Sequence, residues 1–258
     1  MLSAYDVKYY SSLKQKRYRK KENKFLIEGF HLIEECLNSS YNIELIVLSD
    51  VLKSKADKLL FEKARRRNVP VEYVSNRLFN KLSETENSQG IVGVVFQNES
   101  VFFYDRELNK PLVALDCITD PGNLGTIIRT AYWFNIDCIL IGKGSVDVYN
   151  SKVLRSSQGS IFHISVFENL NLVNELSKLT RIGYNIYLFS AKGKDSLTRM
   201  RFSPNSVFVF GNESEGISKE IINSSYNKVK IDGFSKCESL NVAVSCGIVF
   251  NSFRNNIK

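Results

Sequence analysis

The sequence predicts an α/β protein in two parts, a small α/β domain followed by a larger domain built on a parallel sheet. From residue 112 onward, short apolar segments alternate with segments whose apolar residues recur at helical spacing, which is typical of a parallel sheet with helices on both faces. The apolar segments are continuous, as expected of strands covered on both sides. This pattern begins after the polar residues 97–110, which we interpret as a linker.

The first part is assigned to residues 1–105. Helical spacing covers residues 25–37 and 53–66, and β-rich runs lie at 43–48, 71–74 and 91–96. The expected order is helix, strand, helix, strand, helix, strand, which predicts a compact unit with one layered core.

The second part is assigned to residues 106–258. Strands are expected at 112–115, 139–141, 161–166, 186–189, 207–210 and 228–231, with helices at 123–134, 152–158, 170–179 and 240–253. The last helix is apolar nearly all round, so we expect it to be buried on most sides. In such sheets, ligands bind beyond the carboxyl ends of the strands.

The composition is that of a globular protein, with 258 residues of which 43% are hydrophobic. No apolar run approaches the ~20 residues that a membrane helix needs, and the polar, basic start does not resemble a signal peptide. We therefore expect no membrane association and a cytoplasmic location. No cysteine pair has C-x-x-C spacing, so all five are expected to be small buried hydrophobic residues: Cys36, Cys117, Cys138, Cys237 and Cys246.

The formal net charge is +8, and much of the excess lies near the N-terminus. Tyrosines are interleaved with the cations, a combination that suits a phosphate backbone with unstacked bases. A solvated helix face explains the same charges equally well. The candidate RNA-binding residues are Lys14, Lys16, Arg17, Arg19, Lys20 and Lys21.

Three segments place polar residues or glycines directly after an apolar strand. In the first, the strand ending at Leu115 leads through a Pro-Gly turn to a helix that Asn123 is expected to cap, with Arg129 six residues further on. A capped helix start beside an arginine suits a phosphate, although an ordinary helix with a surface arginine fits as well.

The second segment runs from Gly211 to Gly216 and carries two carboxylates but no lysine. It is therefore not a Walker-type phosphate loop and suits a cation or ribose hydroxyls, unless it is a plain turn. In the third segment, Ser239 is expected to cap the last helix and Asn241 to be a buried amide that needs hydrogen-bond partners.

Together these segments resemble the SpoU/TrmH family of RNA ribose 2′-O-methyltransferases. The family pattern Asp-Pro-x-Asn-x-Gly matches Asp120 to Gly125, Gly-x-Glu-x-x-Gly matches Gly211 to Gly216, and Glu-Ser-Leu-Asn-Val matches Glu238 to Val242. Residues 25–29 and 89–92 look like landmarks of the ribosomal-protein-like RNA-binding domain of many members. The resemblance thus covers nearly the whole chain.

The resemblance implies a parallel sheet with a C-terminal deep trefoil knot, a homodimer, an RNA substrate, and S-adenosylmethionine as the cofactor without a metal. It implies catalytic or positioning roles for Arg129, Asn123, Glu213, Ser239 and Asn241, and cofactor contacts from Gly211, Asn212, Gly216, Ile231 and Leu240. Arg129 is either a proton acceptor, which its high reference pKa of ~12.5 opposes, or a clamp on an RNA phosphate. His31 and His163 match no motif and are expected to be structural.

One departure concerns the loop after Ile231, where the family usually has Pro-Met and, two residues later, a glycine. This chain has Asp232, Gly233 and Ser235, and Asp232 is expected either near the cofactor or toward solvent. A non-catalytic RNA-binding paralogue is therefore a rival reading. Ribosomal RNA is the favoured substrate and transfer RNA the alternative. An oxidoreductase is set aside because no G-x-G-x-x-G turn follows a strand.

Overall fold

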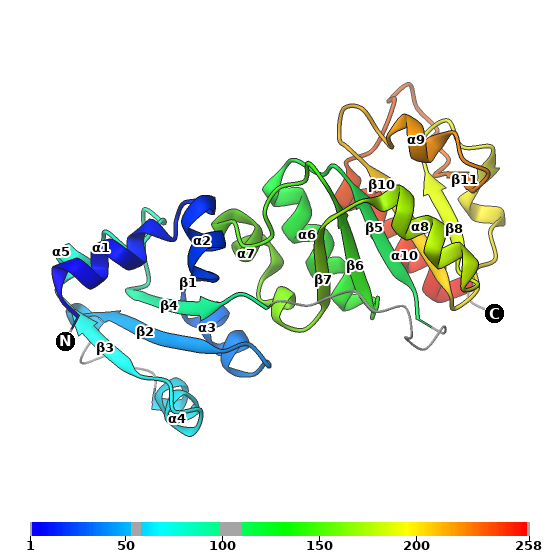
Figure 1. Ribbon diagram of the computed structural model, residues 1–258. Helices are drawn as coiled ribbons and strands as arrows, with labels where there is room; N and C mark the ends of the chain where they lie inside the picture. Colours follow the sequence, from blue (N-terminus) through cyan, green and yellow to red (C-terminus); the bar gives the residue numbers. More distant parts are fainter. Residues whose placement is uncertain (1, 53–57, 99–109, 257–258) are drawn as a thin grey trace. The chain divides into compact units, whose positions relative to one another are not determined.

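The computed structural model describes residues 2–52, 58–98 and 110–256 (Figure 1). The chain forms two compact units, the first comprising Met1–Glu99 and Tyr149–Phe162, the second Ser100–Val148 and His163–Lys258. The predicted boundary between residues 105 and 106 and most of the predicted linker lie outside the described residues. A short stretch from the middle of the chain thus belongs to the N-terminal unit.

The N-terminal unit is built on a four-stranded mixed sheet in the order β1 (Lys24–Glu28), β4 (Ile91–Phe96), β2 (Ile43–Ser49) and β3 (Val71–Val74). β4 is antiparallel to both neighbours, and β2 and β3 are parallel. The helices are α1 (Ala4–Ser12), α2 (Lys16–Glu22), α3 (Phe30–Leu37), α4 (Lys58–Arg66), α5 (Asn76–Phe79) and α7 (Ser151–Ser157).

The start of this unit differs from the prediction. The sequence pattern predicts one helix over residues 25–37, but Phe25 and Ile27 alternate inward as part of β1, and the helix begins only at Phe30. Gly29, at φ +101°, separates the two. The pattern also misses α1 and α2, which are polar; Ser3 and Asp6 form a capping box that helps α1 to start.

The stretch from Tyr149 to Phe162 completes one side of the N-terminal core. The ring of Tyr149 lies 4.4 Å from that of Phe25 between centroids, and Phe162 lies 5.2 Å from Tyr41. The predicted strand at 161–166 is wrong in its first half, because Ser160–Phe162 is a 3-10 turn and β7 begins only at Ser165. The apolar residues Ile161 and Phe162, which suggested a strand, are buried in this turn instead.

The second unit is an all-parallel sheet of seven strands, which confirms the predicted α/β class. The order is β7 (Ser165–Leu170), β6 (Cys138–Gly142), β5 (Leu112–Asp116), β10 (Ser206–Gly211), β8 (Asn185–Phe189), β11 (Asn227–Lys230) and β9 (Asp195–Ser196). The chain proceeds from β5 through β6 to β7 in one direction, whereas β10 lies on the other side of β5. The pair β5 and β10 therefore marks the switch point at which such sheets bind ligands.

Helices cover both faces of this sheet (Figure 1). On one face, α8 (Leu172–Arg181) and α9 (Lys219–Ile222) pack on a cluster that includes Leu140, Leu188 and Val209. On the other face, α6 (Pro121–Trp133) packs against α10 (Val242–Asn256), whose Phe250 contacts Phe208 and Phe210. Successive side chains of a strand point to opposite faces of the sheet. β10 therefore contributes Val209 to the core under α8 and α9, and Phe208 and Phe210 to the core under α6 and α10.

Two expectations about burial need correction. α10 is not covered on most sides, because Val244 and Ile248 are 52% and 37% exposed. Among the cysteines, Cys36, Cys138 and Cys246 are buried as predicted, but Cys237 is exposed and Cys117 is only partly covered. Within the described ranges, none of the helices is long and apolar enough to cross a membrane.

Candidate functional site

The three segments singled out in the sequence meet at the carboxyl ends of β5 and β10. β5 ends at Asp116, whose Oδ2 accepts a hydrogen bond of 2.7 Å from the backbone N–H of Ser218, just beyond the loop after β10. The Nδ2 of Asn212 donates 2.8 Å to the carbonyl of Cys117. The two strand ends are therefore joined by side-chain hydrogen bonds that no sequence pattern indicates.

The loop from Gly211 to Gly216 is a tight closed turn. The backbones of Asn212 and Gly216 exchange two hydrogen bonds, at 2.9 and 3.0 Å, and the Oδ1 of Asn212 accepts from the N–H groups of Ser214 and Glu215. A Cβ on Gly211 would lie 2.1 Å from the carbonyl carbon of Gly216. Only glycine fits at that place.

Glu213, at the tip of this loop, is held by the start of α6. Its carboxylate accepts from the Nδ2 of Asn123 at 3.0 Å, from the N–H of Asp120 at 3.4 Å, and from both the N–H and the hydroxyl of Thr119 at 3.4 and 3.3 Å. Partial burial would raise the pKa of Glu213, but these bonds outweigh it and hold the pKa below its ordinary value. The carboxylate is thus kept ionised and fixed.

Asn123 also joins the third segment to this cluster. Its Oδ1 accepts a hydrogen bond of 2.9 Å from the Nδ2 of Asn241, while the Oδ1 of Asn241 accepts from the N–H groups of Ala243 and Val244. Residues distant in sequence therefore form one chain of side chains, Asn241 to Asn123 to Glu213.

The capping predictions are corrected by these contacts. Asp120, not Asn123, caps α6, because its Oδ1 accepts from the N–H of Asn123 at 2.8 Å and Pro121 occupies the first helical position. Proline at that position is a recognised start signal that could have revealed the cap. Asn241, not Ser239, caps α10, and it is exposed rather than buried.

Arg129 and Ser239 are not hydrogen-bonded to this cluster. Arg129 is exposed on α6 about 9 Å along the helix axis from Asn123, at ~1.5 Å per residue, and in the described part of the chain no carboxylate pairs with it. Ser239 is exposed as well. Of the remaining candidates for cofactor contact, Ile231 is half-buried and Leu240 is 50% exposed.

Asp232 is held within the protein. Its carboxylate accepts a hydrogen bond from the hydroxyl of Ser196 at the end of β9, and its other oxygen lies 3.9 Å from the Nζ of Lys230. This contact joins the beginning of the last loop to the edge of the sheet, so Asp232 does not simply point to solvent.

The chemistry of the site suits a ligand that carries a positive charge and has polar groups around it. Burial is the largest cause that raises the pKa of the Cys117 thiol, and the nearby carboxylates of Asp116, Glu215 and Glu213 raise it further. The electrostatic potential around Cys117 is therefore negative. At Gly211 the two sides of the loop pack backbone against backbone, so the loop is narrow and polar. A sulfonium-bearing nucleoside fits these features. Among the described residues, no His, Cys, Asp or Glu side chains are grouped in a way that could hold a metal ion.

Of the basic candidates in the N-terminal unit, Lys16, Arg17, Lys20 and Lys21 are exposed. Lys14 donates from its Nζ to the carbonyl of Ser83 at 2.6 Å. Arg19 is 5% exposed and its guanidinium donates to the carbonyls of Leu13 and Lys14. The last two therefore serve the fold of this unit in the structure.

Comparison with known proteins gives family matches for both parts of the chain. Residues 110–251 match the model of the SpoU rRNA methylase family, and residues 5–93 match the MRM3-like substrate-binding domain.

Similar proteins are found across nearly the full length. The chain is 32% identical to the 23S rRNA (guanosine(2553)-2′-O)-methyltransferase RlmP of Bacillus subtilis, over 96% of this chain and 95% of that protein. It is 28% identical to the 23S rRNA (guanosine-2′-O-)-methyltransferase RlmB of Neisseria meningitidis, over 88% and 94%. The AdoMet-bound rRNA methyltransferase from Sinorhizobium meliloti superposes with a TM-score of 0.84 at 25% identity, over 96% and 94%.

Proposed function

This chain belongs to the SpoU rRNA methylase family, and we propose that it transfers a methyl group from S-adenosylmethionine to a ribose 2′-hydroxyl of ribosomal RNA. The observation that carries the proposal is the chain of hydrogen bonds from Asn241 through Asn123 to Glu213, which unites the three motif segments at one edge of the sheet.

S-adenosylmethionine, when bound, supplies a methyl group activated by a positively charged sulfur. The loop from Gly211 to Gly216, together with Ile231 and Leu240, would hold it, and the carboxylates around Cys117 favour its charge. A trefoil knot at this end of the sheet is part of the proposal: the chain leaves β11, two strands from β10, and returns to contact Asn123 at the start of α6, next to β5.

The residues of the protein must place the 2′-oxygen in line with the methyl carbon. They must also accept the proton of the 2′-hydroxyl or hold the neighbouring phosphate of the RNA in place. Glu213 fixes Asn123 and Asn241, which can then donate and accept at constant positions. Arg129, exposed on α6, either clamps a phosphate next to the target ribose or accepts the proton of the 2′-hydroxyl. The phosphate clamp is favoured because a guanidinium offers N–H donors and has no free acceptor for the proton.

We further propose that the active form is a homodimer. α10 exposes Val244 and Ile248 one turn apart, with Leu240 just before them, and the adjacent helix α6 exposes Tyr132 and Trp133, at 46% and 83%. Apolar groups of this size, side by side on packed helices, are typical of a protein interface. A partner covering α6 would also bring its own groups to Arg129.

The N-terminal unit is proposed to bind the RNA, with Lys16, Arg17, Lys20 and Lys21 contacting phosphates. Ribosomal RNA is favoured because the two named relatives above act on 23S rRNA; transfer RNA is the alternative substrate, and a cytoplasmic location stays a prediction.

Incubation with methyl-labelled S-adenosylmethionine and unmodified 23S rRNA transcript tests the proposal. We expect label in nuclease-resistant 2′-O-methylated dinucleotides, and none with Arg129→Ala. Tight RNA binding without transfer to rRNA or tRNA would instead favour a non-catalytic binding protein. Transfer to tRNA alone would overturn the choice of substrate.

A further inference from the structure

A polar groove of about 640 Å³ lies in the N-terminal unit, outside the candidate active site. Its walls are α5, the residues after β2, and the loop between residues 83 and 90. Amide and hydroxyl side chains dominate the lining, and those that matter here are Asn76, Asn80, Asn87, Gln89, Ser49 and Ser88.

Two of the amides are fixed with their donor groups unused. The Oδ1 of Asn76 accepts from the hydroxyl of Ser49 at 3.1 Å, and the Oε1 of Gln89 accepts from the N–H of Phe30 at 2.9 Å. Each NH₂ group is thereby oriented but has no partner among the described residues. Asn80 and Asn87 are exposed, and their whole amides are likewise unpaired in the part of the chain that the structure describes.

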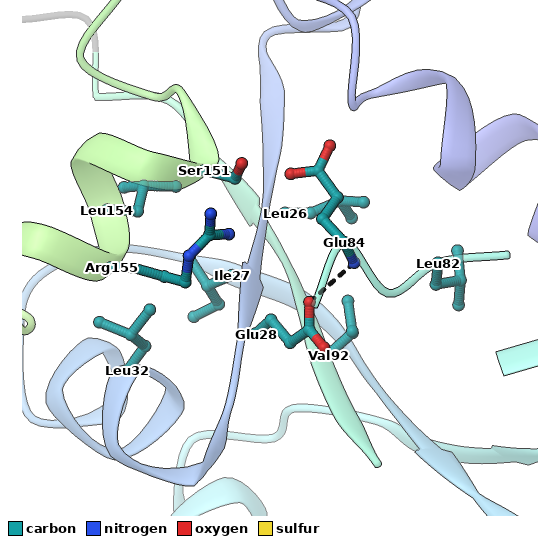
Figure 2. Close-up of a pocket in the computed structure, with 10 residues that line it drawn as sticks. All are labelled: Leu26, Ile27, Glu28, Leu32, Leu82, Glu84, Val92, Ser151, Leu154 and Arg155. Carbon is teal, nitrogen blue, oxygen red and sulfur yellow. Dashed lines mark hydrogen bonds between the residues drawn. The ribbon is translucent and has the colours of Figure 1, made fainter. Parts of the chain in front are cut away.

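The loop wall is held rigid by Glu28 of β1. Its carboxylate accepts from the hydroxyls of Ser83 and Thr85 at 2.6 Å, from the hydroxyl of Ser88 at 2.7 Å, and from the N–H of Glu84 at 2.9 Å. Figure 2 shows Glu28 reaching from its strand toward Glu84 across a small cavity that is also lined by Arg155. A loop tied at four points keeps its amides in place before a ligand arrives, which lowers the entropy lost on binding.

The chemistry of the groove matches one unpaired nucleotide. The fixed amides of Asn76 and Gln89 offer donors, and the exposed amides of Asn80 and Asn87 offer donors and acceptors, which are the groups that pair with the edges of nucleobases. Val51 and Leu52 add apolar surface against which a base can lie. Arg77 and Lys81 do not line the groove, but each is exposed and follows a groove asparagine by one residue, and their long cationic side chains are of the kind that binds phosphate. Glu86 adds one acceptor, suited to a base amino group or a 2′-hydroxyl.

We propose that this groove holds one unpaired nucleotide of the RNA substrate, with the base edge read by the four amides and its phosphate held by Arg77 and Lys81. The inference rests on the proposed function, because it assumes that the ligand of this unit is RNA. Base-edge contacts made in this groove would select the RNA through its single-stranded nucleotides rather than through its helices.

The double variant Asn80→Ala/Asn87→Ala tests the groove, since neither side chain has a hydrogen-bond partner among the described residues whose loss would disturb folding. Asn38→Ala, an exposed asparagine of the same unit outside the groove, is the matched control. The probes are a fluorescein-labelled single-stranded RNA 10-mer of mixed sequence and the corresponding fully paired duplex, measured by fluorescence polarisation.

We expect the double variant to bind the single strand at least tenfold more weakly, with duplex binding and S-adenosylmethionine binding unchanged and the control equal to wild type. In methyl transfer to 23S rRNA, we expect the KM of the double variant for the RNA to rise and its kcat to stay unchanged. Photocrosslinking of a 10-mer carrying 4-thiouridine places the crosslinks within residues 76–90.

Unchanged single-strand affinity, or an equal loss for the duplex, would overturn the inference. Both results come from binding alone, so they hold whether or not methyl transfer occurs. Absence of methyl transfer by the wild-type protein, with selective loss of single-strand binding in the variant, would refute the proposed activity and leave the groove assignment standing.

Discussion

The Nδ2 of Asn241 donates a hydrogen bond of 2.9 Å to the Oδ1 of Asn123, although 118 residues separate them. The other end of the Asn241 amide accepts from the backbone of Ala243. One exposed side chain therefore both starts α10 and ties the last loop to the first helix of the second unit, which makes its two functions separable by mutation.

Asn241→Ser keeps an oxygen that can cap α10 but loses the amide that reaches Asn123. We expect the free energy of unfolding in urea to stay within about 0.5 kcal/mol of wild type, while single-turnover methyl transfer slows at least tenfold, or about 1.4 kcal/mol in the barrier. Asn241→Ala loses the cap as well and is expected to cost about 1 kcal/mol in stability. A wild-type rate for the serine variant would show that the bond to Asn123 does not position the site.

Much of the sheet could be predicted because its strands are continuous apolar runs. Residues 71–74 and 91–96 match β3 and β4 in full, whereas β1 was hidden because its apolar residues run on into those of α3. The motif pattern found Asn123, Glu213 and Asn241, but only the fold brings them into contact. Thr119 and the carbonyl of Cys117 had no signal of their own, since their roles depend on groups exposed where β5 meets α6. Asp120 lay within the motif, and the proline after it indicated the cap that was assigned to Asn123 instead.

Arg129→Ala is expected to reduce methyl transfer more than tenfold without a change in the melting temperature, because the side chain is exposed and makes no ion pair with the described residues. Arg129→Lys distinguishes the two roles. If the guanidinium clamps a phosphate, the lysine variant keeps part of the rate and mainly raises KM for RNA. If it accepts the proton, kcat falls and its pH profile shifts.

Gly211→Ala forces a Cβ to within 2.1 Å of backbone atoms of Gly216. Overpacking of this kind costs about 1–3 kcal/mol or more, and we expect loss of S-adenosylmethionine binding in calorimetry. Gly233→Ala, where a Cβ meets nothing within 4 Å, is the matched control and is expected to bind as wild type. Normal binding by the Gly211 variant would remove this loop from the proposed cofactor site.

Val244→Glu tests the proposed dimer. The side chain is 52% exposed in a single chain, so a lone subunit tolerates the charge, whereas an apolar interface does not. We expect light scattering to report half the wild-type mass and the methyl-transfer rate to fall with it. Val173→Glu, at a 45% exposed position on α8, is expected to alter neither. A monomeric wild-type protein that is fully active would contradict the proposal.

The hydrogen-bonded carboxylate of Glu28 is expected to make the stability of the protein depend on pH. Burial alone would raise its pKa, but the bonds from Ser83, Thr85, Glu84 and Ser88 hold the pKa below its ordinary value. A depressed pKa means that the stabilisation is present above the ordinary value of about 4.3 and is lost as the pH falls through the lower, folded value.

Glu28→Gln is therefore expected to be about 1–3 kcal/mol less stable than wild type at pH 7, with the difference shrinking below about pH 4.3. Glu86→Gln removes the same charge from an exposed position and is expected to leave the urea midpoint unchanged. A stability difference between Glu28→Gln and wild type that is as large at pH 3 as at pH 7 would contradict the assignment.

The placement of Tyr149–Phe162 in the N-terminal unit has a consequence for biosynthesis. A nascent chain of about a hundred residues lacks the rings that lie against Phe25 and Tyr41, so the N-terminal unit cannot close its core on the ribosome until residue 162 has emerged. By then β5, α6 and β6 have also been made. The two units must therefore complete their folding together. A fragment that ends in the predicted linker would lack α7 and would leave the apolar residues that pack against it uncovered.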